Sequence, residues 1–440
     1  MSLTHINDHL AKRYPHEMLY RQAVAEVLES LESHWINGAY DEEQRARLER
    51  LIEPERIITF RVTWTDDTGA LRHNTGYRVQ FNSALGPYKG GLRFDPSVSV
   101  DTLKFLGFEQ VFKNALTGLP LGAGKGGSDF DKKGKSEREI RNFCRAFMLA
   151  LYRELGIDRD VPAGDIGVGG REIGYMFGMY KEIAGNDEGV LTGKNELFGG
   201  SCQRTEATGH GVIYMAKAAL VAHGQELSGK RVIVSGSGNV ALYAARALLD
   251  HQAVVLTVSD RYGHLYNADG FTYPDLTEIE NQKFNGIPLS EIGITGAEYR
   301  DGAPWYEPAD LYVPCATQNE INEDAARAMV EHATLVIEGA NMPLSAAAVK
   351  VVQESQAIYV PGKAANAGGV AVSGLEMAQN AARYPWTCDE VDQKLQTIMR
   401  RIHERCAEYG RREDGSIDYV TGANIAGFVR VFAAMEKLGW

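Results

Sequence analysis

The stretch that most constrains the fold runs from Arg231 to His251 and reads RVIVSGSGNVALYAARALLDH. A short apolar run leads into a glycine-rich turn, and an alanine-rich helical pattern follows. The turn consists of Gly236, Ser237, Gly238, Asn239, Val240 and Ala241. The first glycine suits a tight turn, the second lets a pyrophosphate approach, and free amides at the helix start favour that anion. The stretch therefore predicts a Rossmann-type domain that binds a nicotinamide dinucleotide.

Three charged residues bear on which dinucleotide binds. A second predicted strand, AVVLTVSD, ends at Asp260, about 20 residues beyond the turn, where an acid usually holds the ribose 2′-hydroxyl. Arg261 and Lys283 carry the charge that pairs with a 2′-phosphate. These residues conflict, and we favour NADP while leaving NAD open.

Further apolar runs follow in the same half of the chain. DLYVPCA, ATLVIEGA and AIYVPGKAANAGGVAV predict successive parallel strands, each followed by a helical pattern. Asn319, Asn341 and Asn366 come just after these strands, where ligands bind in open α/β sheets. Each asparagine is equally suited to capping a helix.

Three lysines between Tyr88 and Ser128 have unusual neighbours. Lys89 precedes two glycines, Lys125 lies between two glycines, and Lys113 lies on a strongly apolar helical pattern. Gln110 is three residues before Lys113, so both share one edge of that helix. Three converging ammonium groups would suit a small substrate with more than one carboxylate. They would also depress one another's pKa, as a lysine base requires.

Simpler interpretations of this stretch exist. Lysines in loops are mostly solvated, and glycine clusters are mostly turns. A phosphate-binding loop is excluded, because Leu119 stands where that motif needs glycine and Gly126 where it needs serine or threonine. Asp165 lies in another glycine-rich loop, GDIGVGG, and is the nearest candidate carboxylate for proton transfer with a lysine. No apolar strand is predicted to lead into that loop, so it is a weak match to a dinucleotide fingerprint.

Composition narrows the remaining classes. The 440 residues carry a net charge of −12, which argues against nucleic acid as a partner. No stretch is apolar enough to span a membrane, the start does not read as a secretory signal, and no metal-binding motif occurs. The five cysteines are scattered and odd in number, so we expect a reducing cytoplasm and no disulfide framework.

The chain is long enough for two or three domains. We predict an α/β protein with two domains separated by a cleft. Residues 1–200 would form a mixed α/β substrate and oligomerisation domain, starting with helices up to about Glu53 and strands in IITFRVTWTDD and GYRVQFNSA. Residues 201–419 would form the Rossmann dinucleotide-binding domain, and a terminal helix at 420–440 would pack back on the first domain.

Strings along nearly the whole chain can be compared with known families. They are YKGGLRF, GFEQVFKNAL, GKGGSDFDKKGKS, VPAGDIGVGGRE, RTEATGHG, VSGSGNVA, PCATQNE, EGANMP and KAANAGGVAVSGLEMAQNA. Together they resemble the small hexameric glutamate dehydrogenases of the Glu/Leu/Phe/Val dehydrogenase superfamily. The resemblance implies a cytoplasmic homohexamer that reversibly deaminates L-glutamate to 2-oxoglutarate and ammonium with NADP.

The resemblance also implies roles for the charged residues. Lys125 would be the catalytic lysine and base, and Asp165 the proton-transfer acid. Lys89 and Ser373 would hold the side-chain carboxylate of the substrate.

Further positions follow from the same resemblance. Gln110, Lys113 and the backbone at Gly164 would position the α-carboxylate and amino end. Arg204 and Val370 would line the same cleft. The cofactor would be contacted by Thr208, Asn239, Ala316 and Thr317, with Asn341 and Asn366 nearby.

Two alternatives remain. A related dehydrogenase acting on leucine, valine or phenylalanine would want an apolar residue at Lys89, because a buried cation facing a methyl group is costly. A non-catalytic dinucleotide-binding protein would not need Lys113, Lys125 and Asp165 together. The sequence departs from the family's pattern at Asn195–Glu196 and at His210. Both positions lie near the predicted boundary between the domains, so these departures bear on closure of the cleft and on the rate of turnover, and not on the type of reaction.

Overall fold

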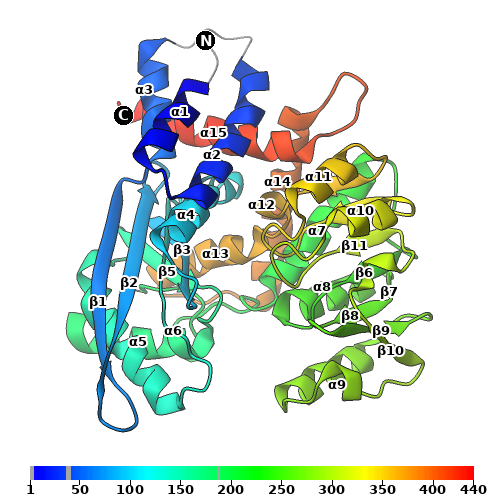
Figure 1. The fold of residues 1–440 in the computed structure, drawn as a ribbon, viewed down its shortest axis with the longest axis horizontal. Helices are drawn as coiled ribbons and strands as arrows, with labels where there is room; N and C mark the ends of the chain where they lie inside the picture. The colour runs from blue at the N-terminus through cyan, green and yellow to red at the C-terminus, as the bar shows by residue number, and fades with distance from the viewer. Residues whose placement is uncertain (1–3, 36–40, 186–188) are drawn as a thin grey trace. The chain divides into compact units, whose positions relative to one another are not determined.

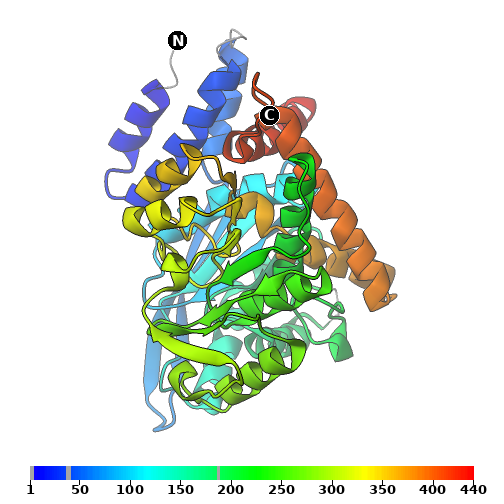
Figure 2. The same ribbon diagram turned by 90° about the vertical axis from the view of Figure 1, so that its right-hand side faces the viewer.

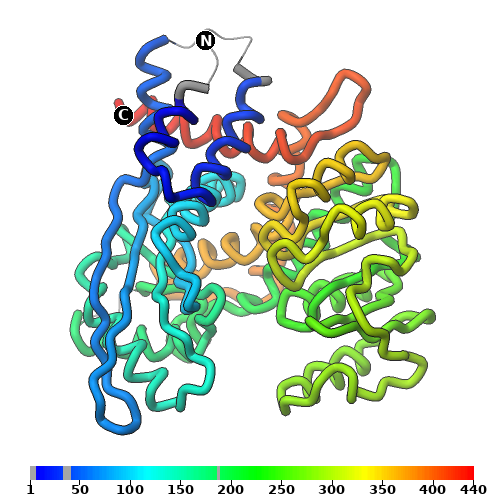
Figure 3. Tube along the Cα trace, in the orientation of Figure 1, coloured from blue at the N-terminus to red at the C-terminus, as the bar shows by residue number. Residues whose placement is uncertain are grey.

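The structure, a computed structural model, describes residues 4–35, 41–185 and 189–440. The chain divides into two compact units (Figures 1 and 3). The first unit comprises residues 1–204, 370–391 and 424–440, and the second comprises 205–369 and 392–423. The stretch predicted as one continuous cofactor domain, 201–419, therefore contributes residues 201–204 and 370–391 to the first unit.

The first unit is built on a five-stranded sheet of order β1-β2-β4-β3-β5. Strands β1 and β2 form a long antiparallel hairpin, which Figure 1 shows in blue, and β4 is antiparallel to β2. Strand β3 runs parallel to both β4 and β5. The bounds are β1 (Arg56–Thr65), β2 (Leu71–Asn82), β3 (Tyr88–Phe94), β4 (Ala123–Ser128) and β5 (Asp160–Gly164).

Helices cover this sheet and enclose an aromatic core. Helix α4 packs against β2 and β4, and α5 packs against β1 and α6. The rings of Phe130 and Phe143 stack with centroids 3.8 Å apart in that core. The helices are α1 (Thr4–Arg13), α2 (Met18–Trp35), α3 (Glu42–Ile52), α4 (Val100–Leu116), α5 (Glu137–Leu151) and α6 (Gly170–Ala184), with short turns η1 (Tyr152–Glu154) and η2 (Glu196–Phe198).

The C-terminal segment contacts helices α2 and α3 within the first unit. Figures 1 and 2 both show the red C-terminal helix α15 (Tyr419–Lys437) beside the blue N-terminal helices. Arg47 Nε donates to the backbone oxygen of Trp440 at 2.9 Å, and Asn424 Nδ2 donates to Ser30 Oγ at 2.9 Å. Residues 424–440 thus belong to the unit that starts at the N-terminus.

Three strands of the first unit are not among those predicted. YKGGLRF forms β3, AGKGGS forms β4, and the run DVPAG forms β5, directly before Asp165. The expectation that no strand leads into the Asp165 loop was therefore wrong. Glycine and proline are depleted in strands, which hides these three from a pattern based on apolar alternation.

The glycines in these strands are needed because the backbones lie unusually close. An ideal Cβ at Gly90 would overlap the carbonyl oxygen of Gly124 on the neighbouring strand. One at Gly91 would lie 2.8 Å from Asp165 Cβ and 2.8 Å from the Gly164 oxygen. Side chains are absent here so that the strands can approach each other around the lysines.

The second unit holds two sheets. The parallel sheet has the order β13-β12-β11-β6-β7, which confirms the predicted parallel strands. The run AVVLTVSD splits into β7, beside β6, and β8, which joins an antiparallel sheet of order β10-β9-β8. The strands are β6 (Arg231–Val234), β7 (Val254–Val255), β8 (Thr257–Ser259), β9 (Gly263–Asn267), β10 (Ala297–Asp301), β11 (Leu311–Val313), β12 (Leu335–Ile337) and β13 (Ile358–Val360).

Helices flank the parallel sheet of the second unit. One core cluster includes Ile233, Tyr312 and Val336 from three neighbouring strands, together with side chains of α10 and α11. The helices that begin between Arg204 and α15 are α7 (Ala207–Ala222), α8 (Asn239–Asp250), α9 (Tyr273–Phe284), α10 (Glu323–Val330), α11 (Ala346–Gln353), α12 (Gly362–Ala365), α13 (Gly368–Ala382) and α14 (Cys388–Gly410), with turns η3 (Leu289–Glu291) and η4 (Pro304–Tyr306).

The cysteines contradict the expectation that none is paired. Cys202 and Cys388 form a disulfide with Cα atoms 5.3 Å apart, whereas Cys144, Cys315 and Cys406 are buried and free. The partners are 186 residues apart in sequence. Spacing therefore gave no sign of the pair, and only the fold brings the two segments together.

Two features are absent from the residues that the structure describes. None of the helices described is long and apolar enough to cross a membrane. Within the same residues, no group of three or more histidine, cysteine, aspartate and glutamate side chains is arranged to hold a metal ion.

The close approach of β3 and β4 can be tested with one methyl group. We expect Gly90→Ala to lower the free energy of unfolding by ~3 kcal/mol or more, because the new Cβ has to displace backbone. The matched control is Gly178→Ala at an exposed position of helix α6, where a Cβ would meet nothing within 4 Å, and we expect this variant to gain ~0.5–1 kcal/mol of stability. Urea denaturation of both variants measures this, and equal stability would contradict the packing argument.

Candidate functional site

The predicted lysines and Asp165 come together in the first unit because three neighbouring strands carry them. Lys89 is on β3, Lys125 is on β4, and Asp165 directly follows β5. Parallel pairing aligns these strands, since Leu92 of β3 pairs with Gly126 of β4 and with Gly164 of β5. Helix α4 adds Gln110 and Lys113, as its apolar pattern predicted.

Lys125 and Asp165 form the centre of this group, which we call the lysine cluster (Lys89, Lys113, Lys125 and Asp165). Lys125 Nζ lies 3.1 Å from Asp165 Oδ2, and Arg93 Nε donates to the same oxygen at 2.9 Å. Burial alone would raise the pKa of Asp165, but Lys125 and Arg93 outweigh it and lower this pKa to about 2. The carboxylate is therefore ionised at neutral pH in this arrangement.

Burial also makes the cluster lysines easier to deprotonate. It is the largest cause that lowers the pKa of Lys125, with Asp165 opposing and Arg93 adding to the effect. The pKa of Lys113 falls to about 8 through burial and the neighbouring Lys125. Desolvation by burial is thus the largest cause for both lysines, whereas the repulsion between cations that the sequence predicted comes second for Lys113 and, for Lys125, after the opposing attraction of Asp165.

Lys89 lies at one end of the cluster and is fully buried. Its Nζ donates to Thr192 Oγ1 at 2.7 Å, and burial together with nearby Arg204 holds the pKa of Lys89 well below its usual value. Arg204 Nε donates to Ser373 Oγ at 3.0 Å, which joins two further predicted residues. Val370 lies on helix α13, three residues before Ser373.

Gln110 and Gly164 contribute to the surroundings of the cluster. Gln110 Nε2 donates to Asn114 Oδ1 at 2.7 Å. The buried Asn114 in turn donates to the Lys89 oxygen at 3.0 Å, which ties α4 to β3. Gly164 ends β5, and a Cβ there would come 2.5 Å from the Val168 oxygen.

Several residues of this site were missed by sequence reasoning. Arg93 contacts Asp165, and Thr192 accepts from Lys89, but neither stands out in the sequence. Lys194 and Glu376 form a fully buried ion pair of 2.7 Å. Glu376 also accepts from the amide of Gly193 at 2.8 Å and so holds the loop that carries Thr192.

The predicted dinucleotide turn lies in the second unit and has the expected local geometry. Gly236 has φ +88°, a conformation that favours glycine, and a Cβ there would lie 3.2 Å from Ala316 Cα. Helix α8 begins at Asn239, directly after the exposed Gly238, and Val240 lies in its first turn. The N-terminal amides of a 12-residue helix therefore face an accessible glycine turn, which fits a pyrophosphate.

The three residues expected to set the preference between NADP and NAD have different surroundings in the structure. Lys283 Nζ contacts Ser237 Oγ on the glycine turn. Burial lowers the pKa of Lys283, and Asp260 opposes this. Asp260 Oδ1 accepts from the amides of Tyr262 and Gly263 at 2.8 and 3.2 Å, as in a turn. Arg261 is exposed, with its guanidinium 5.9 Å from the centre of the Tyr262 ring.

The asparagines after the parallel strands brace the loops they lie in. Asn366 is buried, and its Nδ2 donates to Asn341 Oδ1 at 2.9 Å and to the Gly339 and Ala340 oxygens. Asn319 has φ +55°, and its amide donates to the Met342 oxygen at 2.9 Å.

The remaining cofactor candidates are in two other places. The amides of Ala316 and Thr317, after β11, donate to Glu320 Oε1 at 3.1 and 3.3 Å. Burial raises the pKa of Glu320 to about 7. Thr208 lies in the first turn of α7, apart from these loops in sequence.

The two sequence departures occupy defined positions. Asn195 caps the short turn η2 by accepting from the amide of Leu197 at 3.0 Å. His210 lies on α7 with its ring centre 6.1 Å from that of Tyr243 and 6.3 Å from that of Tyr214. Burial lowers the pKa of His210, which favours its neutral form beside these two rings.

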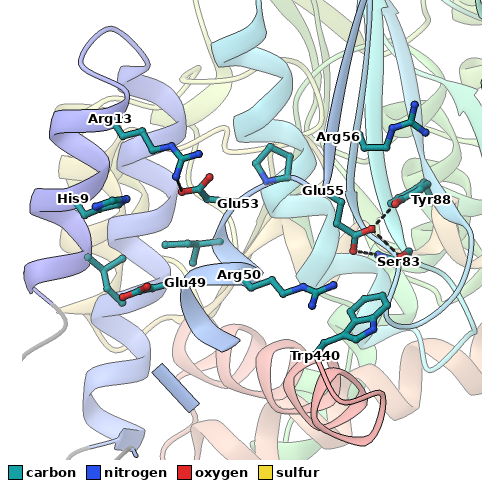
Figure 4. A pocket seen from close by; sticks show the side chains of 13 residues that line it. His9, Arg13, Glu49, Arg50, Glu53, Glu55, Arg56, Ser83, Tyr88 and Trp440 are labelled. Carbon is teal, nitrogen blue, oxygen red and sulfur yellow. Dashed lines mark hydrogen bonds and ion pairs between the residues drawn. The ribbon is translucent and has the colours of Figure 1, made fainter. Parts of the chain in front are cut away.

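A cavity of about 760 Å³ lies elsewhere in the first unit and is lined by none of the predicted site residues. Figure 4 shows Glu55 facing Ser83 and Tyr88 on one side and Trp440 below. Two of its arginines have partners within the lining: Arg13 pairs with Glu53 at 3.0 Å, and Arg50 lies over the Trp440 ring. The lysine cluster therefore remains the candidate substrate site.

Comparison with known proteins agrees with this geometry. Residues 54–182 match the Glu/Leu/Phe/Val dehydrogenase dimerisation domain, and residues 199–439 match the Glutamate/Leucine/Phenylalanine/Valine dehydrogenase model. The chain is 51% identical to an NAD(P)-specific glutamate dehydrogenase of Xylanibacter ruminicola, covering 100% of both chains. It is 51% identical to the NADP-specific glutamate dehydrogenase of Escherichia coli, covering 100% of this chain and 98% of the relative.

A solved structure, Plasmodium falciparum glutamate dehydrogenase, matches with a TM-score of 0.97 at 46% identity, covering 100% of this chain and 95% of that one. The family models and the relatives therefore cover both units described above. The chain belongs to the Glutamate/Leucine/Phenylalanine/Valine dehydrogenase family.

Proposed function

We propose that the protein catalyses the reversible oxidative deamination of L-glutamate to 2-oxoglutarate and ammonium, with NADP as its preferred cofactor and NAD as a possible one. Full-length relatives that are about half identical are glutamate dehydrogenases. The observation that carries the choice of a dicarboxylate is the fully buried Lys89. A buried ammonium facing an apolar substrate side chain would be costly, which disfavours leucine, valine or phenylalanine as substrate.

In this proposal, residues of the first unit bind the substrate through its charges. Lys89 and Ser373 hold the side-chain carboxylate, supported by the contacts to Thr192 and Arg204. Lys113, Gln110 and the backbone at Gly164 hold the α-carboxylate and amino end, and Val370 lines the site. A substrate carboxylate would add an oppositely charged partner for these buried ammonium groups.

Proton transfer is assigned to Lys125 and Asp165. Lys125 accepts the proton that the α-amino group of glutamate has to lose, since burial favours its neutral form. Asp165 is ionised at the start of the reaction. It receives the proton from Lys125 and returns it during hydrolysis of the substrate imine. The 3.1 Å separation between Nζ and Oδ2 supports this exchange.

The second unit supplies the cofactor residues. When bound, the nicotinamide accepts or donates the hydride. Gly236, Ser237, Gly238, Asn239 and Val240 would hold the pyrophosphate, and Lys283 with Arg261 would pair with a 2′-phosphate, against Asp260. The remaining assigned contacts are Thr208, Ala316, Thr317, Asn341 and Asn366.

The assembly and location are also part of the proposal. The two units would act as substrate and cofactor domains. A homohexamer in the cytoplasm is supported by kinship with the small glutamate dehydrogenases and by the match of residues 54–182 to a dimerisation domain.

Removing the lysine amine tests the proposed base. We expect Lys125→Ala to lower kcat ~10²- to 10⁴-fold while NADPH still binds, because the cofactor residues are untouched. The control is Lys133→Ala, an exposed lysine in a turn, which should turn over normally. Absorbance at the NADPH band gives turnover and NADPH fluorescence gives binding. Near-normal kcat in Lys125→Ala would refute the assignment.

The pKa of Lys113 predicts how substrate binding depends on pH. A lysine with a pKa of about 8 is charged below that pH and neutral above it, so 2-oxoglutarate should bind more weakly as pH rises. If Lys113 alone titrates, we expect the dissociation constant of 2-oxoglutarate to rise up to ~tenfold for each pH unit above this pKa. Calorimetry from pH 6 to 9.5 measures this. Lys113→Gln should bind weakly throughout and lack that step; an unchanged profile in the variant would assign the step elsewhere.

Cofactor choice can be tested by removing both cations. Arg261→Ser with Lys283→Gln should weaken NADPH ~tenfold or more while changing NADH little, because only NADPH carries a 2′-phosphate. Arg327→Gln, an exposed arginine on α10 of the same unit, is the control for general charge loss. If the double variant loses affinity for NADPH and NADH equally, these residues do not bind the 2′-phosphate.

A further inference from the structure

The disulfide between Cys202 and Cys388 lies on a solvent-accessible part of the first unit. Cys388 is exposed and starts helix α14, and Cys202 is half-buried in the segment before α7. The other three cysteines are fully buried. An oxidant or reductant in solution therefore reaches this pair and not the others, and exposed disulfides are usually the labile ones.

Both cysteines lie close to points where the chain leaves the first unit. The chain passes into the second unit after Arg204, two residues beyond Cys202, and again after Val391, three residues beyond Cys388. The bond thus ties together two of the segments that connect the units. It joins two residues that are 186 positions apart in the sequence.

The segment that carries Cys202 is fastened to helix α13, which carries substrate-site residues. Asn380 Nδ2 donates to the Gly199 oxygen at 2.6 Å, and Gln379 Nε2 donates to Ser201 Oγ at 2.8 Å. At the end of this segment, Arg204 donates to Ser373.

Gln379 also connects to the other half of the disulfide. Its Oε1 accepts from the amide of Trp386 at 2.9 Å, two residues before Cys388. The covalent bond and Gln379 therefore hold the same two segments side by side. Loss of the bond leaves Arg204 positioned by hydrogen bonds alone.

We propose that Cys202 and Cys388 are a reversible redox site that adjusts substrate affinity through Arg204 and Ser373. A low-molecular-weight disulfide such as glutathione disulfide would be the oxidant. The Cys388 thiolate attacks one sulfur of that disulfide, forming a mixed disulfide and releasing one thiol. The Cys202 thiolate then attacks the Cys388 sulfur and releases the second thiol. Two cysteines lose two electrons in total, and one small disulfide becomes two thiols.

This site rests on the proposed function in two respects. In a reducing cytoplasm, protein disulfides are mostly transient or redox-sensing, so a permanent structural role is disfavoured. The effect on affinity depends on the proposed role of Ser373 with the side-chain carboxylate. Oxidation keeps Arg204 against Ser373 and so favours the binding arrangement; reduction loosens it.

The test equilibrates the full-length enzyme with glutathione and glutathione disulfide at graded ratios. Free thiols are trapped by alkylation and located by mass spectrometry, and KM for 2-oxoglutarate is measured in the same samples. We expect Cys202 and Cys388 to change together while the buried cysteines do not react. The reduced enzyme should show KM raised ~threefold, since losing a well-held hydrogen bond costs about that factor or more, with kcat changed less than ~twofold.

Serine variants separate the possible outcomes. Cys202→Ser and Cys388→Ser should show the high KM at every ratio, and Cys144→Ser, a buried cysteine outside the pair, should respond as the wild type does. Thiols that never pair in excess glutathione disulfide, equal KM in both states, or serine variants that still respond would each overturn the proposal. Alkylation needs no turnover, so a wrong substrate assignment would show as absent activity while the thiols still titrate.

Discussion

Buried charge is the constraint on which the first unit depends. Three ion pairs lie inside it with little or no exposure: Arg78 with Asp160, Lys125 with Asp165, and Lys194 with Glu376. An isolated charge in such a place costs several kcal/mol, on the order of what a whole domain has to spare. In each of these pairs the cation is held by a carboxylate from another segment of the chain: β5 for Arg78, the loop after β5 for Lys125, and α13 for Lys194.

The glycine-rich strands are what make this arrangement possible. Gly90 and Gly91 let β3 lie against the oxygen of Gly124 and against Asp165, and a Cβ at Gly91 would lie 3.3 Å from Lys125 Nζ. The same strands need Arg78, whose guanidinium binds Asp160 and also donates to the Gly90 oxygen at 3.2 Å. Packing and electrostatics are therefore linked in this unit. Because the glycines have no side chains, the strands pack closely, and the resulting loss of water lowers the pKa values of the buried lysines.

Sequence patterns predicted the parts of the site that depend on local rules. The strand, turn and helix around Gly236 were predicted correctly because the apolar run and the glycine spacing that define them lie within one continuous stretch of sequence. Helix α4 was recognised from its apolar period. Strands β3, β4 and β5 were missed because their glycines and proline oppose strand propensity, and tertiary contacts override it. Arg93, Thr192 and the disulfide were missed because ordinary residues far apart in sequence gave no signal.

The sequence by itself determined the family, the dinucleotide turn and the set of lysines, because these follow from residue types at fixed spacing. Only the tertiary structure decided that Lys125 lies 3.1 Å from Asp165, that Lys89 is fully buried against Thr192, and that Cys202 meets Cys388. The physical reason is that pKa values and covalent pairing depend on distance and loss of water. Both are properties of how strands from distant parts of the chain pack, and neither is encoded in spacing along it.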